Sequence, residues 1–235
     1  MQTRIKTIPI LPFGMLNAFL AIGPGGAILV DTGLPGSTRL ISRALEAAEL
    51  GWRDIKLIVL THGHIDHAGS AADIRRLTGA PVLYHTLEMR YCMGERPVLH
   101  PTRLFGRLFL MTGAIERPFP PVTADIQMQG ESFDLKTLGF AGTVWHTPGH
   151  TPGSVSLLLS GGDVLAGDLA ASGILLGGIA LLDRPERPPF EEHPHIAARS
   201  LEELLSMGAK RFYLGHGGPL GVEPIARHAA RLKRL

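Results

Sequence analysis

Apolar segments of two kinds follow one another along the chain and predict strands and helices in turn. Residues 15–22 and 27–30 are apolar and are joined by a Gly-Pro-Gly-Gly turn, which indicates a β-hairpin. Residues 55–60 form a nearly continuous apolar run, typical of a strand that is buried on both faces. Shorter apolar runs predict further strands at residues 81–84, 133–135, 142–146, 154–159, 164–166 and 211–214.

Helical spacing of apolar residues appears in four other segments. Ser37 can cap a helix that runs to about residue 50 and stops at Gly51. Further helices are predicted at residues 67–78, 194–207 and from 225 to the end of the chain. Strand-rich and helical segments therefore alternate, which favours two mixed sheets packed together with helices outside. No low-complexity linker divides the 235 residues, so we expect residues 1–235 to form a single domain.

Residues 88–121 interrupt this pattern and look like an insertion with only broken helix. Prolines occur there among residues that are apolar for a loop, namely Tyr91, Met93, Leu104, Phe105, Leu108, Phe109, Leu110, Met111 and Phe119. The insertion is expected either to form a lid over an apolar substrate pocket or to bury itself against a second subunit in a homodimer. In the first case Phe105, Phe109 and Met111 are the candidate pocket residues. The apolar, glycine-rich stretch 173–182 is a candidate for the opposite wall.

Composition and charge narrow the class of protein. Hydrophobic residues make up 45% of the chain and charged residues 19%, which suits a folded domain with a sizeable core. The net charge of +2 gives no basic patch of the kind that nucleic-acid binding requires. The apolar stretch 8–30 is broken by prolines and glycines, so no membrane span is expected. Cys92 is the only cysteine, so no intrachain disulfide can form and the cytoplasm is the expected compartment.

Three histidines and an aspartate lie within six residues directly after the buried strand 55–60. They are His62, His64, Asp66 and His67. Imidazole nitrogen and carboxylate oxygen suit zinc and its neighbours in the transition series. His62 and His64 are alternate residues and can point to one ion, whereas the next two are displaced toward a second position.

Three more candidate ligands follow predicted strands farther along the chain. His150 lies in the Thr-Pro-Gly-His-Thr-Pro-Gly turn, Asp168 follows Gly167, and His216 lies in Gly-His-Gly-Gly. Each stands beside a glycine, which lets the backbone approach closely. The six other histidines lack partners at ligand spacing.

Together these residues resemble the metal signature of the metallo-β-lactamase superfamily, and residues 30–33 resemble its early acidic loop. The resemblance implies a four-layer αββα sandwich with the site at one edge. It implies that His62, His64 and His150 hold one metal ion. The second ion would be held by Asp66, His67 and His216. Asp168 would bridge the two ions, and Asp31 would orient a ligand histidine through a hydrogen bond.

The implied chemistry is that of a dinuclear metallo-hydrolase. Two divalent cations lower the pKa of a shared water, so that a bridging hydroxide forms near neutral pH and attacks an acyl or phosphoryl centre. Asp66 could then carry the proton to the leaving group. Zinc is the expected metal, with iron and manganese as alternatives.

Departures from known branches of the family narrow the substrate. Asp168 argues against β-lactams as the main substrate, because class B β-lactamases generally lack the bridging aspartate. Only 19 residues follow His216, so the C-terminal glutathione-binding domain of typical glyoxalase II is not expected. Ala171 stands where similar lactonases often have tyrosine. The main hypothesis is hydrolysis of an ester-like bond (lactone, thioester or carboxylic ester) in a small molecule with an apolar portion. The alternatives are a mononuclear iron persulfide dioxygenase and a phosphodiester or β-lactam hydrolase.

Overall fold

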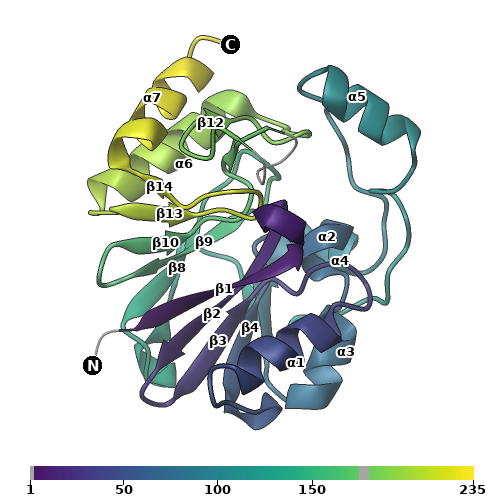
Figure 1. Ribbon diagram of the computed structural model, residues 1–235, viewed down its shortest axis with the longest axis vertical. Coiled ribbons are helices and arrows are strands. Elements are labelled where there is room, and N and C mark those ends of the chain that lie inside the picture. The colour runs from purple at the N-terminus through teal and green to yellow at the C-terminus, as the bar shows by residue number, and fades with distance from the viewer. Residues whose placement is uncertain (1–2, 175–179) are drawn as a thin grey trace.

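The computed structural model describes residues 3–174 and 180–235, in which two six-stranded sheets pack face to face (Figure 1). In spatial order the first sheet contains β1 (Arg4–Leu11), β2 (Leu16–Gly23), β3 (Gly26–Val30), β4 (Ile55–Val59), β5 (Val82–His85) and β6 (Ile126–Met128). The second sheet contains β14 (Leu220–Gly221), β13 (Arg211–Tyr213), β10 (Asp163–Leu165), β9 (Val155–Leu159), β8 (Gly142–His146) and β7 (Ser132–Asp134). A separate two-stranded ribbon pairs β11 (Ala171–Ser172) with β12 (Pro185–Glu186).

Helices cover the outer faces of both sheets and complete four layers. The helices are α1 (Thr38–Glu46), α2 (Ile65–Ala68), α3 (Ala71–Thr78), α4 (Met89–Cys92), α5 (Leu104–Met111), α6 (Pro194–Ser206) and α7 (Val222–Leu232). Helices α1 and α3 lie on the first sheet, and α6 and α7 lie on the second (Figure 1). The predicted αββα sandwich is confirmed.

The side-chain alternation of a strand explains how β3 serves two layers at once. Leu29 packs with Ile41 of α1 on the outer side of the first sheet. Its neighbours Ile28 and Val30 point the other way, into the core between the sheets, where they share a cluster with Leu157 of β9. Because both faces of β3 are buried, the strand is apolar throughout.

The strand directions bring the candidate ligand loops to one edge. Strands β3, β4 and β5 run parallel, so their carboxyl ends lie together. In the second sheet β10 and β13 are also parallel. Loops that follow these strands can meet at that edge, which is where active-site loops of layered α/β folds gather.

The helix predicted at residues 67–78 is wrong in detail, because two helices stand there. The first, α2, begins two residues earlier, and the chain turns at Gly69 before α3. A Cβ on Gly69 would collide with Pro35 and with the carbonyl oxygen of Ile65. This close approach is possible because Gly69 has no side chain.

Two strands of the first sheet lay outside the predicted set. Strand β1 is an edge strand with a largely exposed side, so its mixed polarity gave a weak signal. Strand β6 has only three residues, Ile126–Met128, and follows the insertion. Strand β1 pairs with β2, which follows it directly in sequence, whereas β6 pairs with β5, which lies about forty residues earlier.

The insertion 88–121 contains α4 and α5 joined by irregular chain, as the broken pattern predicted. Figure 1 shows α5 standing out from the two sheets. Among the residues that the structure describes, no helix is both long and apolar enough to cross a membrane.

Candidate metal centre

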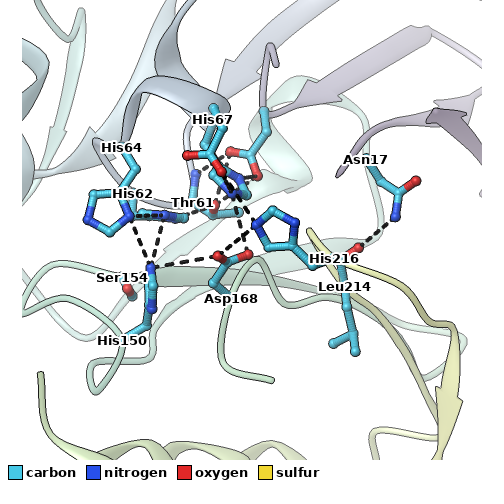
Figure 2. Close-up of polar contacts among 12 residues, drawn as sticks. Asn17, Thr61, His62, His64, His67, His150, Ser154, Asp168, Leu214 and His216 are labelled. Atoms are coloured by element: carbon cyan, nitrogen blue, oxygen red, sulfur yellow. Dashed lines mark hydrogen bonds and ion pairs between the residues drawn. The ribbon is translucent and has the colours of Figure 1, made fainter. Parts of the chain in front are cut away.

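The candidate ligands lie at the edge of the sandwich where the two sheets meet, and Figure 2 labels all of them except Asp66. Two follow β4, two belong to α2, and the others come from the loops after β8, β10 and β13. The candidate ligands are His62, His64, Asp66, His67, His150, Asp168 and His216. The loop that carries His216 can approach Asp168 closely because Gly215 has no side chain. A Cβ at this position would collide with the Asp168 carboxylate.

Three histidine nitrogens form a compact triangle. His62 Nε2 lies 3.1 Å from His64 Nδ1, and His150 Nε2 lies 3.1 Å and 3.2 Å from the same two atoms. The centre of such a triangle is about 1.8 Å from each nitrogen, slightly less than a zinc–nitrogen bond of 2.0–2.1 Å. The spacing of the three nitrogens therefore fits a single zinc-sized ion.

A second group lies next to the first. His216 Nε2 is 3.4 Å from Asp66 Oδ2, and His67 Nε2 is 3.8 Å from the same oxygen. Asp168 stands between the groups, with Oδ2 3.2 Å from His216 Nε2 and 3.7 Å from His150 Nε2. The carboxylate of Asp168 thus lies between the two groups.

Several buried atoms of these side chains have no hydrogen-bond partner in the described chain, namely His64 Nε2, Asp66 Oδ1, His67 Nε2, His150 Nδ1 and Asp168 Oδ1. His67 Nε2 and Asp168 Oδ1 face each other at 3.4 Å. Buried polar atoms are rarely left without partners, because desolvation costs free energy. A mixed set of imidazole nitrogens and carboxylate oxygens that converges in this way fits divalent transition-metal ions.

Burial and mutual charge shift the pKa values in opposite directions in the two groups. Burial, with the neighbouring histidines, lowers the pKa of His64 to about 3, and that of His62 is lowered by the same causes. Burial also opposes charge on His216, but the carboxylates of Asp168 and Asp66 raise its pKa to about 10. The three-histidine group is therefore neutral in the metal-free protein, whereas the second group carries compensating charges.

Asp31 orients His67 from behind. Its Oδ2 lies 2.8 Å from His67 Nδ1, and its Oδ1 accepts a hydrogen bond from the backbone N–H of Thr61 at 2.8 Å. The hydrogen bond that the orienting role requires is present, and it turns His67 Nε2 toward Asp168. Asp31 has φ of +59°, a left-handed conformation that aspartate and asparagine tolerate better than most residues.

Asn17 anchors the loop of His216, a role that sequence reasoning missed. Its side-chain amide donates to the carbonyl oxygens of Leu214 and Gly217, at 3.2 Å and 3.1 Å. His216 Nδ1 lies 2.5 Å from the carbonyl oxygen of Met15, which fixes the ring (Figure 2 shows Asn17 beside this loop). The available signal was a single buried amide within the apolar segment 15–22.

A cavity of about 600 Å³ opens above the ligands, and His64, Asp66, His150, Asp168 and His216 form its polar part. Its walls are mostly apolar and include Leu11, Met15, Leu34, Ile65, Phe109, Ile115 and Phe190.

The three pocket candidates of the insertion have different positions. Phe109 lines the cavity. Phe105 lines a neighbouring cavity and stacks on Phe109 with ring centroids 6.0 Å apart. Met111 is 82% exposed and lines neither, because α5 turns it outward to solvent. In the stretch 173–182, residues 175–179 lie outside the described part of the chain.

Comparison with known proteins agrees with this geometry. Residues 11–216 match the family model described as the metallo-β-lactamase superfamily, and this span includes all seven ligands. The chain belongs to the metallo-β-lactamase superfamily. It is 30% identical over 207 residues to the probable metallo-hydrolase YflN of Bacillus subtilis, covering 84% of this chain and 77% of YflN.

Other members of the superfamily show the breadth of the resemblance. The hydroxyacylglutathione hydrolase GloC of Haemophilus influenzae is 26% identical over 183 residues, covering 77% of each chain. The crystal structure of the family protein TTHA1429 from Thermus thermophilus superposes with a TM-score of 0.67 at 26% identity, covering 98% of this chain and 78% of that one. The chain is thus a probable metallo-hydrolase of this superfamily, with histidine and aspartate clusters suited to metal.

Proposed function

We propose that this protein is a dinuclear metallo-hydrolase that cleaves an ester-like bond in a small molecule with an apolar portion. The bond is a lactone, a thioester or a carboxylic ester. The observation that carries the proposal is Asp168, whose carboxylate lies between two complete ligand groups at the base of an apolar cavity.

The ligand groups divide the work of metal binding. His62, His64 and His150 would hold one ion, and Asp66, His67 and His216 the other, with Asp168 shared between them. Zinc is the metal that best suits these ligands. Two such ions supply a hydroxide near neutral pH and polarise the oxygen of the bond to be cleaved.

The chain's own side chains would position the substrate and move the proton. The apolar cavity walls bind the hydrocarbon part of the substrate and exclude bulk water from the base of the site. Asp66 also lines this cavity, and its side chain is 17% exposed, so it can reach both the site and the leaving group. Burial alone would raise the pKa of Asp66, but His67 and His216 lower it to about 2, so its side chain is a carboxylate that could bind a cation.

Two alternative activities use the same fold and make different demands on the metal. A mononuclear iron persulfide dioxygenase needs one iron ion, which two histidines and one carboxylate hold in non-haem iron oxygenases. Four of the seven candidate ligands would then not bind the iron. A phosphodiester or β-lactam hydrolase would use both groups but a more polar pocket. The number of candidate ligands favours two ions over one iron ion, and the apolar walls favour ester-like substrates over phosphodiesters.

The test is a substrate panel on metal-reconstituted protein with and without a chelator. The panel contains an acyl lactone, a glutathione thioester, an aryl ester, a phosphodiester and a β-lactam, and the bound metal is counted in the same preparation. Two zinc ions per chain with chelator-sensitive turnover of an ester-like substrate support the proposal. One iron per chain, or turnover of the phosphodiester or β-lactam alone, contradicts it.

A further inference from the structure

Glu88 is a completely buried carboxylate at the start of the insertion, between two loops that carry metal ligands. Its exposed fraction is 0%. Oε2 accepts a hydrogen bond from the backbone N–H of Gly63 at 2.8 Å. Oε1 accepts hydrogen bonds from the Thr151 hydroxyl at 2.8 Å and from the backbone N–H of Gly153 at 2.9 Å. One side chain therefore joins two loops that are about ninety residues apart in sequence.

The donors to Glu88 are next to the three-histidine group. Gly63 lies between His62 and His64, and Thr151 directly follows His150. A shift of either donor moves a ligand nitrogen. Because the three nitrogens are only 3.1–3.2 Å apart, small shifts change how well they fit one ion.

The packing around Glu88 leaves little freedom for either loop. A Cβ on Gly63 would lie 2.7 Å from Tyr91 Cβ, so α4 presses directly on the backbone between the first two ligands. A Cβ on Gly153 would lie 2.8 Å from Glu88 Cγ and Oε1. Both loops therefore approach this segment as closely as a glycine allows.

The charge of Glu88 also suits a metal site. All three hydrogen bonds are accepted by the carboxylate, and no cationic side chain pairs with it in the part of the chain described. Burial raises the pKa of Glu88, so its negative charge is costly without compensation. A cation held by the neighbouring three-histidine group would supply part of that compensation, since charges interact more strongly in a buried site than in water.

We propose that Glu88 is a positioning residue, which clamps the loop of His62 and His64 to the loop of His150 and thereby sets the metal affinity of the three-histidine group. The inference rests on the proposed function only in that this group binds a metal ion. Outer partners of metal ligands commonly change affinity by about 10- to 100-fold when they are removed.

The test measures Co²⁺ affinity at each group separately. In a His216→Ala background only the three-histidine group is complete, and in a His150→Ala background only the second group is complete. Glu88→Gln is expected to weaken Co²⁺ binding about 10- to 100-fold in the first background and to change the visible absorption of the bound Co²⁺. In the second background it is expected to leave the affinity unchanged.

Two further variants separate positioning from general stability. Glu191→Gln removes an equally buried carboxylate (2% exposed) that pairs with Arg187 instead of a ligand loop. It is expected to lower the melting temperature without changing Co²⁺ affinity. Thr151→Val removes only one of the three hydrogen bonds and is expected to have an intermediate effect on affinity, which gives a result if Glu88→Gln does not fold.

The outcomes distinguish the inference from the proposed function. The clamp is overturned if Co²⁺ affinity and absorption are unchanged in both Glu88→Gln and Thr151→Val. It is also overturned if Glu88→Gln lowers Co²⁺ affinity equally in the two backgrounds. If the protein without substitutions binds no Co²⁺, both the clamp and the metallo-hydrolase are wrong.

A separate observation concerns the charge of the substrate. Among the residues that line the cavity above the metal centre, Arg117 is the one arginine or lysine. It lies on the chain that follows α5, is exposed, and forms no ion pair within residues 3–174 and 180–235. Its guanidinium can therefore pair with an anionic group of a bound molecule.

We infer that the preferred ester-like substrate has an anionic group at the end of its apolar portion, held by Arg117. This inference rests on the proposed function. It is tested with two aryl esters of equal length, one ending in a carboxylate and one in a neutral amide. Arg117→Gln is expected to lower kcat/KM about tenfold for the anionic ester, which corresponds to about 1.4 kcal/mol, and to leave the neutral ester unchanged.

The control is Arg107→Gln, which removes an arginine of α5 that does not line the cavity. It should change neither ester's kcat/KM. An equal effect of Arg117→Gln on both esters, or no effect on either, overturns the inference while leaving the hydrolase intact. Failure of the protein to cleave or be inhibited by either ester contradicts the proposed function and this inference together.

Discussion

Asp31 Oδ2 lies 2.8 Å from His67 Nδ1, and this contact ties the early acidic loop to a ligand that comes 36 residues later. Because Nδ1 is engaged, Nε2 is the nitrogen that faces Asp168. Burial opposes charge on His67, but the carboxylates of Asp168 and, to a smaller extent, Asp31 raise its pKa well above the usual value.

Asp31→Asn tests this orienting contact. Asparagine tolerates the left-handed backbone at this position, so the substitution removes charge without straining the chain. We expect metal affinity at the second group and kcat/KM to fall about 10- to 100-fold. Metal titration together with steady-state kinetics checks this, and unchanged affinity would show that Asp31 is only a turn residue.

Asp168→Ala removes the carboxylate that lies between the groups. We expect loss of detectable turnover and a lower metal content per chain, because two cations at such a site need a negative bridge. Elemental analysis and the ester assay measure the two effects. Full activity in this variant would rule out the bridged two-metal site.

Removal of metal is expected to lower stability as well as activity. A ligand that binds only the folded state adds about 4 kcal/mol when its concentration is a thousand times Kd. For a chain of this size this corresponds to a shift of about 8–16 °C in Tm. Thermal unfolding with and without chelator measures the shift, and zinc should reverse it. An identical Tm in both samples would contradict a metal site at this position.

Phe109→Ala tests the apolar wall of the cavity. We expect KM for a long-chain ester to rise about three- to tenfold, whereas a short-chain ester changes little, because the lost contact is apolar. Met111→Ala is the matched control, since Met111 is 82% exposed on the same helix. Equal effects of both variants on the long ester would indicate a general change of α5.

His228 of α7 predicts a pH dependence of stability away from the metal centre. Burial, followed by the positive charges of Arg231, Arg187 and Arg103, lowers its pKa to about 4. Between pH 6.5 and 4 the unfolded chain therefore binds more protons than the folded chain, and stability falls as the pH decreases.

The full effect of that shift is at most about 3 kcal/mol. His228→Gln should flatten the dependence between pH 6.5 and 4, as measured by denaturant unfolding. His195→Gln, a surface substitution, should not. If the two variants give parallel curves, His228 does not carry the dependence.

The sequence alone determined the layers of the fold and the identity of the candidate ligands. Strands 55–60 and 27–30 were readable because burial on both faces requires a continuous apolar run. The ligands were readable because His62, His64, Asp66 and His67 are local in sequence and directly follow such a strand. His150, Asp168 and His216 are far apart in the sequence, so their assignment to one ion or the other came from the family resemblance.

Only the tertiary structure decided which atoms meet. Glu88 and Asn17 are single polar residues without a motif, and their roles depend on partners up to two hundred residues away. Likewise, Phe109 and Met111 are equally apolar in sequence, yet one lines the cavity and the other faces solvent. A local pattern fixes burial and ligand chemistry, because these depend on neighbouring residues. Contacts between distant loops depend on strand order and direction, which only the assembled sheets define.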